Sequence, residues 1–340
     1  MDIGIAFDLK PSEPLPDGAP DDLHEEFDAP VTIQAIGDVF RSLGHTVREL
    51  GDGKPLLDAL LHRPPDLVFN FAEGVGTSRS REARVPAVCE MLGIPYSGSD
   101  PLAMAVSLDK DMTRRVAESA GVRVPKGMTF SFPVGPYDGE FAEFPPMLAE
   151  SGLRLPVLAK PVCEGSSKGI RSRCLIETAD QFGPTVAGLW HDYGQPILVE
   201  EFIDGDEVTV GVIGNDPPEV FGVMKISPKG SADRFVYSVE VKRDYLRLID
   251  YECPAVIPAE LMREVEDAAL ILFSSLGCRD VARLDFRIRD REPYFLEINP
   301  LPGLNPESSD LVIMARLLNV SHAELVKRIL AATLARLNLA

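Results

Sequence analysis

The 340-residue chain is poor in the residues that build zinc sites, disulfide frameworks and aromatic surfaces. It has five histidines, one tryptophan and five scattered cysteines, none of which forms a C-x-x-C pair. An odd number of dispersed cysteines argues against a disulfide framework and favours a reducing cytoplasm. The histidines show no metal-binding spacing, so we expect them to be structural or exposed.

Positive charge and long apolar runs are also scarce. The chain carries 34 Lys and Arg against 53 Asp and Glu, a formal net charge of −19, which would repel nucleic acids and anionic membranes. No apolar run approaches the length that spans a bilayer. The acidic start, Met1-Asp2, does not resemble a signal peptide. We therefore expect a cytoplasmic protein that binds small molecules, with no nucleic-acid or membrane partner.

The hydrophobic content of 45% is that of an ordinary globular protein, and the length predicts two or three domains. Strand-like and helix-like segments alternate over the first hundred residues, which predicts a parallel sheet. The first domain is placed at residues 1–105, with an acidic, proline-rich linker at 10–28. Its expected elements are strands at 2–9, 45–50 and 66–71 and helices at 29–43, 56–62 and 80–92.

Two further sections are expected at residues 106–195 and 196–340. The first should hold a helix at 109–119, an irregular stretch at 130–156 and a strand at L-P-V-L-A-K-P. The second should open with a hairpin that turns at D-G-D and joins I-L-V-E-E-F-I to E-V-T-V-G-V-I. Beyond it we expect strands near 220–226 and 235–241, helices at 259–276, 309–318 and 321–337, and a hairpin at 281–299.

This last hairpin carries the most informative polar pattern, because Arg283 and Asp285 alternate with apolar residues in its first limb, and Glu297 and Asn299 do so in its second. Asp285 and Glu297 share a face if they pair directly or at an even offset, which requires an odd number of loop residues. Oxygen ligands of this kind suit Mg²⁺, or Mn²⁺, better than zinc. The alternative is the wet face of a half-buried sheet.

A second site is predicted at E-G-S-S-K-G, residues 164–169, which follows a strand that carries Lys160. Glycines and small hydroxyl residues let backbone N–H groups surround phosphate oxygens. The segment lacks the P-loop spacing and could equally be an ordinary turn. Lys110 alone could be a solvated helix lysine.

The order of the motifs resembles one family. From residue 67 to residue 329 the chain presents, in order, F-N-F-A-E-G, G-I-P-Y-S-G-S-D-P-L-A, S-L-D-K-D-M-T, V-L-A-K-P-x-x-E-G-S-S-K-G, I-L-V-E-E-F-I-D-G-D-E-V-T-V, A-R-L-D-F-R and F-L-E-I-N-P-L-P-G-L. This series is similar to that of D-alanine-D-alanine ligases in the ATP-grasp superfamily. The resemblance implies an α/β (α+β) fold, an N-terminal parallel-sheet domain followed by a two-lobed ATP-grasp fold.

The resemblance also implies that ATP lies between the two lobes. It implies Mg²⁺ or Mn²⁺ on Asp285, Glu297 and Asn299, and catalytic roles for Arg283, Gly303, Ser166 and Lys242. The implied ATP-binding residues are Lys110, Lys160, Glu164, Gly165, Ser166, Ser167, Glu200, Glu201, Phe202, Ile203 and Glu207.

In this family ATP phosphorylates a carboxylate, and an amine attacks the acyl phosphate to form an amide. The resemblance implies a role in peptidoglycan synthesis, amino-acid-like substrates and a homodimer. Ser308 or Ser309 would bind the carboxylate of the second substrate. The alternative is a non-catalytic ATP-binding module of the same fold.

The chain departs from the family on the side of the first substrate, the donor. A-E-G-V-G-T-S-R-S-R-E-A stands where the ligases carry His-Gly and Gly-Glu-Asp-Gly. The new donor-side residues are predicted to be Glu73, Arg79, Arg81 and Glu82. Glu25 or Glu26 would replace the glutamate that meets the donor amino group, and Arg243 stands where a tyrosine is expected beside Lys242.

Overall fold

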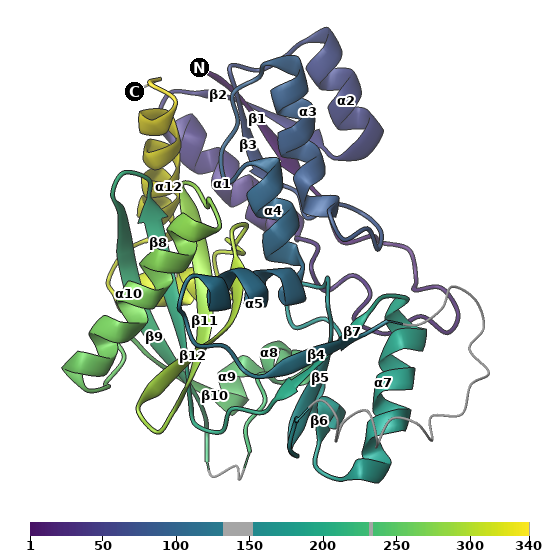
Figure 1. The fold of residues 1–340 in the computed structure, drawn as a ribbon. Helices are drawn as coiled ribbons and strands as arrows, with labels where there is room; N and C mark the ends of the chain where they lie inside the picture. Colours follow the sequence, from purple (N-terminus) through teal and green to yellow (C-terminus); the bar gives the residue numbers. More distant parts are fainter. Residues whose placement is uncertain (132–151, 231–233, 340) are drawn as a thin grey trace.

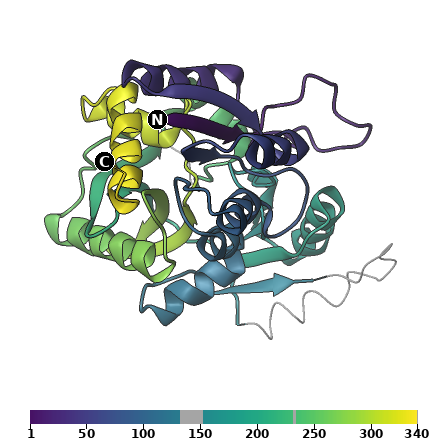
Figure 2. The ribbon, with the colours of Figure 1, turned by 90° about the horizontal axis from the view of Figure 1, so that it is seen from above.

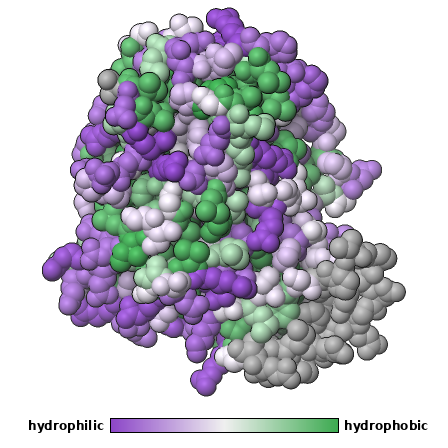
Figure 3. Space-filling model, turned by 45° about the horizontal axis from the view of Figure 1, so that its top comes forward, coloured by the Kyte–Doolittle hydropathy of each residue, from purple (hydrophilic) through white to green (hydrophobic). Residues whose placement is uncertain are grey.

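The computed structural model describes residues 1–131, 152–230 and 234–339, which form three sheets (Figure 1). Within these ranges no helix has the length and apolar character needed to cross a membrane. Figure 3 shows hydrophobic patches interspersed with hydrophilic residues on one face of the molecule, a mixture that is normal for a surface in contact with water.

The N-terminal sheet is parallel, with the strand order β2-β1-β3, as the alternating pattern predicts. Its central strand is buried along nearly its whole length, as expected for a parallel strand covered on both faces. Its elements are β1 (Asp2–Phe7), α1 (Pro30–Ser42), β2 (Thr46–Gly51), α2 (Gly53–His62), β3 (Leu67–Phe71), a 3₁₀ turn (Arg81–Ala83) and α3 (Arg84–Leu92).

Two consecutive helices, α4 (Pro101–Leu108) and α5 (Lys110–Ser119), lead from the first sheet to the rest of the molecule (Figure 1). The carboxylates of Asp100 and Asp109 cap them by accepting from the N–H groups of Ala103 and Met112. The sequence pattern does not predict α4, because its nearly uniformly apolar residues carry no helical period.

The second sheet is antiparallel, with the order β4-β7-β5-β6, and α7 (Ala179–Tyr193) packs on it. Its strands are β4 (Gly127–Phe130), β5 (Val157–Pro161), β6 (Leu175–Ile176) and β7 (Ile197–Glu201). The predicted irregular stretch at 130–156 falls mostly on residues 132–151, outside the described residues.

The predicted hairpin at D-G-D is wrong. Strand β7 pairs with β4 and β5, whereas the next strand, β8 (Asp206–Gly214), pairs with β9 and β11 in the third sheet. Gly205 makes this crossing at a φ of +144°, and a Cβ there would lie 1.9 Å from the Ile288 carbonyl oxygen. A glycine that marks a hairpin turn in the sequence is here required by close backbone contact.

The third sheet is antiparallel, with the order β10-β9-β8-β11-β12, and α10 packs on it. Its elements are β9 (Pro218–Pro228), α8 (Val239–Arg243), α9 (Tyr245–Leu248), β10 (Ile249–Glu252), α10 (Ala259–Ser275), β11 (Val281–Arg289), β12 (Glu292–Asn299), α11 (Asp310–Leu317) and α12 (His322–Arg336).

The strand expected at 235–241 is also wrong, because that segment ends in α8. Its backbone is bonded outside any sheet: the Phe235 carbonyl accepts from the Arg287 guanidinium, and the Val239 N–H donates to the Ile170 carbonyl. The alternating aromatics Phe235 and Tyr237 pack on a core without joining a strand ladder.

The first and last parts of the chain share one hydrophobic core. Residues of β1, β3 and α1 pack with those of α11 and α12, and Figure 2 shows the C-terminal helices beside the N-terminal sheet. This contact holds the N-terminal sheet over the rest of the molecule and defines the opening between them.

Candidate active site

The hairpin β11-β12 presents its polar residues as the sequence predicts. Asp285 pairs with Glu297, and Arg283 pairs with Asn299. The loop, however, has two residues, Asp290 and Arg291, both at positive φ. A two-residue loop alone would not pair Asp285 with Glu297. A β-bulge between Asp285 and Phe286 shifts the register by one residue, and this shift brings the two carboxyl groups opposite each other in place of the predicted odd-numbered loop.

Buried cations neutralise the carboxylates of this hairpin. Arg283 donates to Asp285 at 2.9 and 3.1 Å, and Lys110 lies 3.0 Å from Glu297. Burial opposes the ionisation of Glu297, yet the charges of Lys110, Lys160 and Lys242 lower its pKa well below the ordinary value. The hairpin holds two carboxyl groups and the Asn299 amide on one face, a donor set of hard oxygens.

The Glu164–Gly169 loop follows β5 of the second sheet and is linked to the hairpin through Lys110. Ser166, Ser167 and Gly169 adopt positive φ angles of 50°, 59° and 77°, a left-handed backbone that is typical of a tight turn. Lys110 donates to the Glu164 carbonyl at 2.5 Å. Lys110 is thus a buried link between loop and hairpin and not a solvated helix residue.

A narrow cavity of about 70 Å³ lies between the second and third sheets. Three ion pairs organise its wall: Lys160 with Glu200 at 2.6 Å, Arg287 with Glu207 at 2.8 Å, and Arg289 with Glu201 at 2.6 Å. The lining also includes Ser167, Phe202, Ile203, Lys242, Asp285 and Glu297. The residues assigned to ATP by resemblance are thus brought together here and at the adjoining loop.

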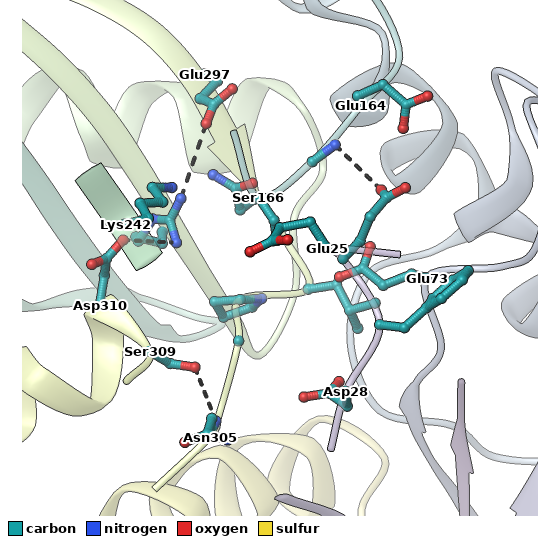
Figure 4. A pocket seen from close by; sticks show the side chains of 18 of the residues that line it. Glu25, Asp28, Glu73, Glu164, Ser166, Lys242, Glu297, Asn305, Ser309 and Asp310 are labelled. Atoms are coloured by element: carbon teal, nitrogen blue, oxygen red, sulfur yellow. Dashed lines mark hydrogen bonds and ion pairs between the residues drawn. The ribbon is translucent and has the colours of Figure 1, made fainter. Parts of the chain in front are cut away.

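A larger cavity of about 390 Å³ adjoins the hairpin and is lined from all three parts of the fold (Figure 4). On its C-terminal side lie Gly303, Ser308 and Ser309, and the Ser309 hydroxyl accepts from the Asn305 N–H at 2.9 Å. Ser166 and Lys242 also line it. Its volume is typical of a site for small molecules.

Comparisons with known proteins agree with this geometry. A family model described as "D-ala D-ala ligase C-terminus" matches residues 142–331, more than half of the chain. A D-alanine--D-alanine ligase from Aquifex aeolicus is 32% identical over 274 residues, which cover 80% of this chain and 84% of the relative. The chain belongs to the D-alanine-D-alanine ligase family.

Solved structures of this family share the fold. The D-alanine--D-alanine ligase from Bacillus anthracis complexed with ATP has a TM-score of 0.70 at 19% identity, over 99% of this chain and 97% of that one. The VanG D-Ala:D-Ser ligase from Enterococcus faecalis has a TM-score of 0.69 at 21% identity, over 98% and 99% of the two chains. The family assignment makes the protein an ATP-grasp ligase and favours catalysis over a pure nucleotide-binding module.

The donor-side residues that depart from the family pattern fall into two groups. Glu73 and Glu82 line the larger cavity. Arg79 does not: its side chain is two-thirds exposed and pairs with Asp109 at 2.6 Å. Arg81 also lies outside the lining, because it is buried behind the wall and pairs with Glu26 at 2.5 Å and Glu164 at 3.1 Å. The structure therefore places neither arginine in the lining of the larger cavity, and their contact with the donor stays a prediction.

The segment expected to be a linker is a structural part of the site. Residues 20–28, here called the acidic strap, pack onto the Glu164–Gly169 loop. Asp22 is fully buried and accepts from the Gly169 N–H at 3.0 Å, and Glu26 accepts from Lys168 at 2.8 Å. Glu25 pairs with Arg243 at 2.7 Å. These partners are distant in sequence, so the acidic, proline-rich composition of residues 10–28 predicts only a linker and gives no sign of these contacts.

Proposed function

We propose that this ligase joins the carboxylate of a donor amino acid to the amine of a second amino-acid-like substrate, through an acyl phosphate formed from ATP. One observation carries the proposal: the hairpin carboxylates, Lys110, Lys160 and Arg283 converge where the narrow cavity meets the larger one. This is the junction where a terminal phosphate would meet a donor carboxylate.

The nucleotide would lie in the narrow cavity. Phe202 and Ile203 would contact the adenine with Glu200 and Glu201, Glu207 would lie toward the ribose, and Lys110, Lys160 and the Glu164–Ser167 loop would hold the phosphates. Asp285, Glu297 and Asn299 would hold Mg²⁺, or Mn²⁺, which neutralises phosphate charge when bound. The oxygen donors of these three residues fit such an ion.

The donor carboxylate oxygen would attack the γ-phosphorus, and ADP would leave. The amine of the second substrate would then attack the acyl carbon, lose a proton and expel phosphate. Arg283 and the Gly303 N–H would stabilise the tetrahedral oxyanion, because fixed donors placed where charge develops lower the barrier. Ser308 or Ser309 would bind the carboxylate of the second substrate, and Lys242 and Ser166 would cover the junction.

The test is an ADP-release assay coupled to a pair of substitutions. Arg283→Lys keeps the charge but loses the planar fork, so kcat should fall about 100-fold while the KM for ATP stays within about threefold. Arg263→Lys, on the exposed side of α10, is the matched control. ATP binding without ADP release for any pairing of D- or L-amino acids would contradict the proposal.

A further inference from the structure

The donor side of the larger cavity carries more negative charge than the protein itself neutralises. Most acidic groups around the cavity have a basic partner: Glu25 with Arg243, Glu26 and Glu164 with Arg81 and Lys168, Glu297 with Lys110, and Asp310 with Arg283. Among the residues that the structure describes, Glu73, Glu82 and Asp28 line the same cavity and form no ion pair.

Glu82 is the most enclosed of the three, with 6% of its surface exposed. Its carboxyl group contacts that of Glu73, and the charges of Arg81 and Lys110 act on it without forming an ion pair. Arg81 is adjacent in sequence, but its guanidinium is bonded to Glu26, Glu164 and the Cys163 carbonyl. Two carboxyl groups in contact cannot both ionise without a cation between or beside them.

The surroundings keep these acids partly protonated. Burial raises the pKa of Glu82 to about 7 and that of Asp28 to about 7, and burial together with the charge of Glu82 raises the pKa of Glu73 well above its ordinary value. Unpaired buried acids cost stability. A ligand that brings positive charge would remove that cost.

The position of the three acids identifies which substrate they face. Glu73 and Asp28 lie across the cavity from Lys242 and Asp310 (Figure 4), and all three belong to the N-terminal part of the fold, the donor side. Of the basic groups that line the cavity, Lys110, Lys242 and Arg283 lie at the junction. Lys10 lies beside Asp28, to whose carbonyl its N–H donates, but its side chain is exposed and forms no ion pair with the three acids.

We propose that the donor is an amino acid with a second cationic group, a diamino or other basic amino acid, and that Glu73, Glu82 and Asp28 bind its ammonium or guanidinium groups. This inference rests on the proposed ligase function. A neutral donor such as alanine supplies one ammonium group, which leaves part of the carboxyl cluster buried and unpaired. A second cation satisfies the remainder through charge-assisted hydrogen bonds.

The test compares isosteric donors that differ in one charge: D- and L-lysine against norleucine, and ornithine against norvaline. Hydroxylamine serves as the amine, because it converts any acyl phosphate to a hydroxamate and removes the second substrate as a variable. We expect kcat/KM for the basic donor to exceed that for its neutral isostere by about 10- to 100-fold. Equal or better use of the neutral donors overturns the inference while leaving the ligase function intact.

Substitutions assign the effect to the cluster. Glu82→Gln and Glu73→Gln should each reduce the preference for lysine over norleucine by about tenfold or more, with the KM for ATP unchanged. Glu49→Gln, on the exposed side of β2, is the matched control. A preference that survives both substitutions contradicts the assignment.

A binding measurement without turnover separates the preference for a basic donor from the proposed ligase function. Calorimetry of the wild-type protein with lysine or norleucine, in the presence of a non-hydrolysable ATP analogue, measures recognition by the cavity. If no donor yields a hydroxamate, the proposed function fails. Tighter binding of lysine than of norleucine would then still support an acidic pocket for a basic amino acid, and equal binding would overturn it.

Discussion

Glu73 and Glu82 are two buried carboxyl groups in contact, an arrangement that lowers the stability of the folded protein and that a bound cation would relieve. Glu82 is enclosed by the protein and feels the charges of Arg81 and Lys110, yet it forms no direct ion pair with a described residue. Structural acids in the same region, such as Glu26, are held by Arg81 and Lys168, whose charges, against the effect of burial, lower the pKa of Glu26 to about 2. An acid left unpaired beside such well-paired neighbours is better explained by a ligand than by folding.

This contrast predicts the effect of pH on Glu82→Gln. Because the folded state raises the pKa of Glu82 from about 4.5 to about 7, the folded protein holds the proton more tightly than the unfolded chain. The free-energy cost of ionising Glu82 in the folded state is therefore absent below about pH 4.5, grows as the pH rises from 4.5 to 7 and is constant above 7. Glu82→Gln should raise the free energy of unfolding by about 2 kcal/mol at pH 8 and by little at pH 5. Urea denaturation at both values measures this, and an equal effect at both pH values would contradict it.

At the scale of elements, the passage from β7 to β8 decides how the two ATP-binding sheets face each other. The chain leaves one sheet at Glu201 and enters the other at Asp206. Gly205 lies directly against the Ile288 carbonyl oxygen of β11. The narrow cavity, lined on one side by Lys160 and on the other by Asp285, exists because these few residues connect the sheets at close range.

We therefore expect Gly205→Ala to lower the free energy of unfolding by about 3 kcal/mol, since the new Cβ meets a backbone atom and the positive φ is strained. The KM for ATP should rise as well, because the sheets must shift. Gly188→Ala is the control: Gly188 lies in α7, where a Cβ would meet no atom within 4 Å, so it should be neutral or stabilising by up to about 1 kcal/mol. Thermal unfolding and ATP titration of both variants measure the two effects. A Gly205→Ala variant as stable as Gly188→Ala would contradict the prediction.

For the whole molecule, a net charge of −19 repels polyanions, so any nucleotide must meet local positive charge. Lys110, Lys160, Lys242 and Arg283 supply it, and they come from four separate elements of the chain, α5, β5, α8 and β11. The larger cavity is lined by all three parts of the fold, so a ligand that binds there or at the junction stabilises the arrangement of the entire chain.

Mg²⁺ with ATP at about 100 times its Kd should stabilise the folded protein by about 2.7 kcal/mol, a rise in Tm of about 5 °C. Asp285→Asn should remove most of the magnesium-dependent part of this shift, whereas Asp267→Asn, on the exposed side of α10, should preserve it. The measurement is Tm with ATP in EDTA and with ATP and Mg²⁺. An identical shift in both conditions would exclude a magnesium role for the hairpin.

Local sequence patterns determined the parallel N-terminal sheet, most helices and the polar face of the β11-β12 hairpin. Alternation with period 2 or 3.6 reflects contacts between near neighbours, so it is visible without the fold. The order of the motifs was enough to indicate the family and the reaction class.

The tertiary structure decided what depends on distant partners. Glu26 meets Arg81 across 55 positions and Lys168 across 142, and such pairs leave no periodic trace in the sequence. For the same reason the sequence predicted a linker at the strap and a hairpin of β7 and β8. Arg79 and Arg81, predicted as donor contacts, lie outside the lining of the larger cavity. Which acids are paired, and which are left to a ligand, is set by the three-dimensional distribution of charge, because a carboxylate is stabilised by the cation beside it in space and not by its neighbours in the chain.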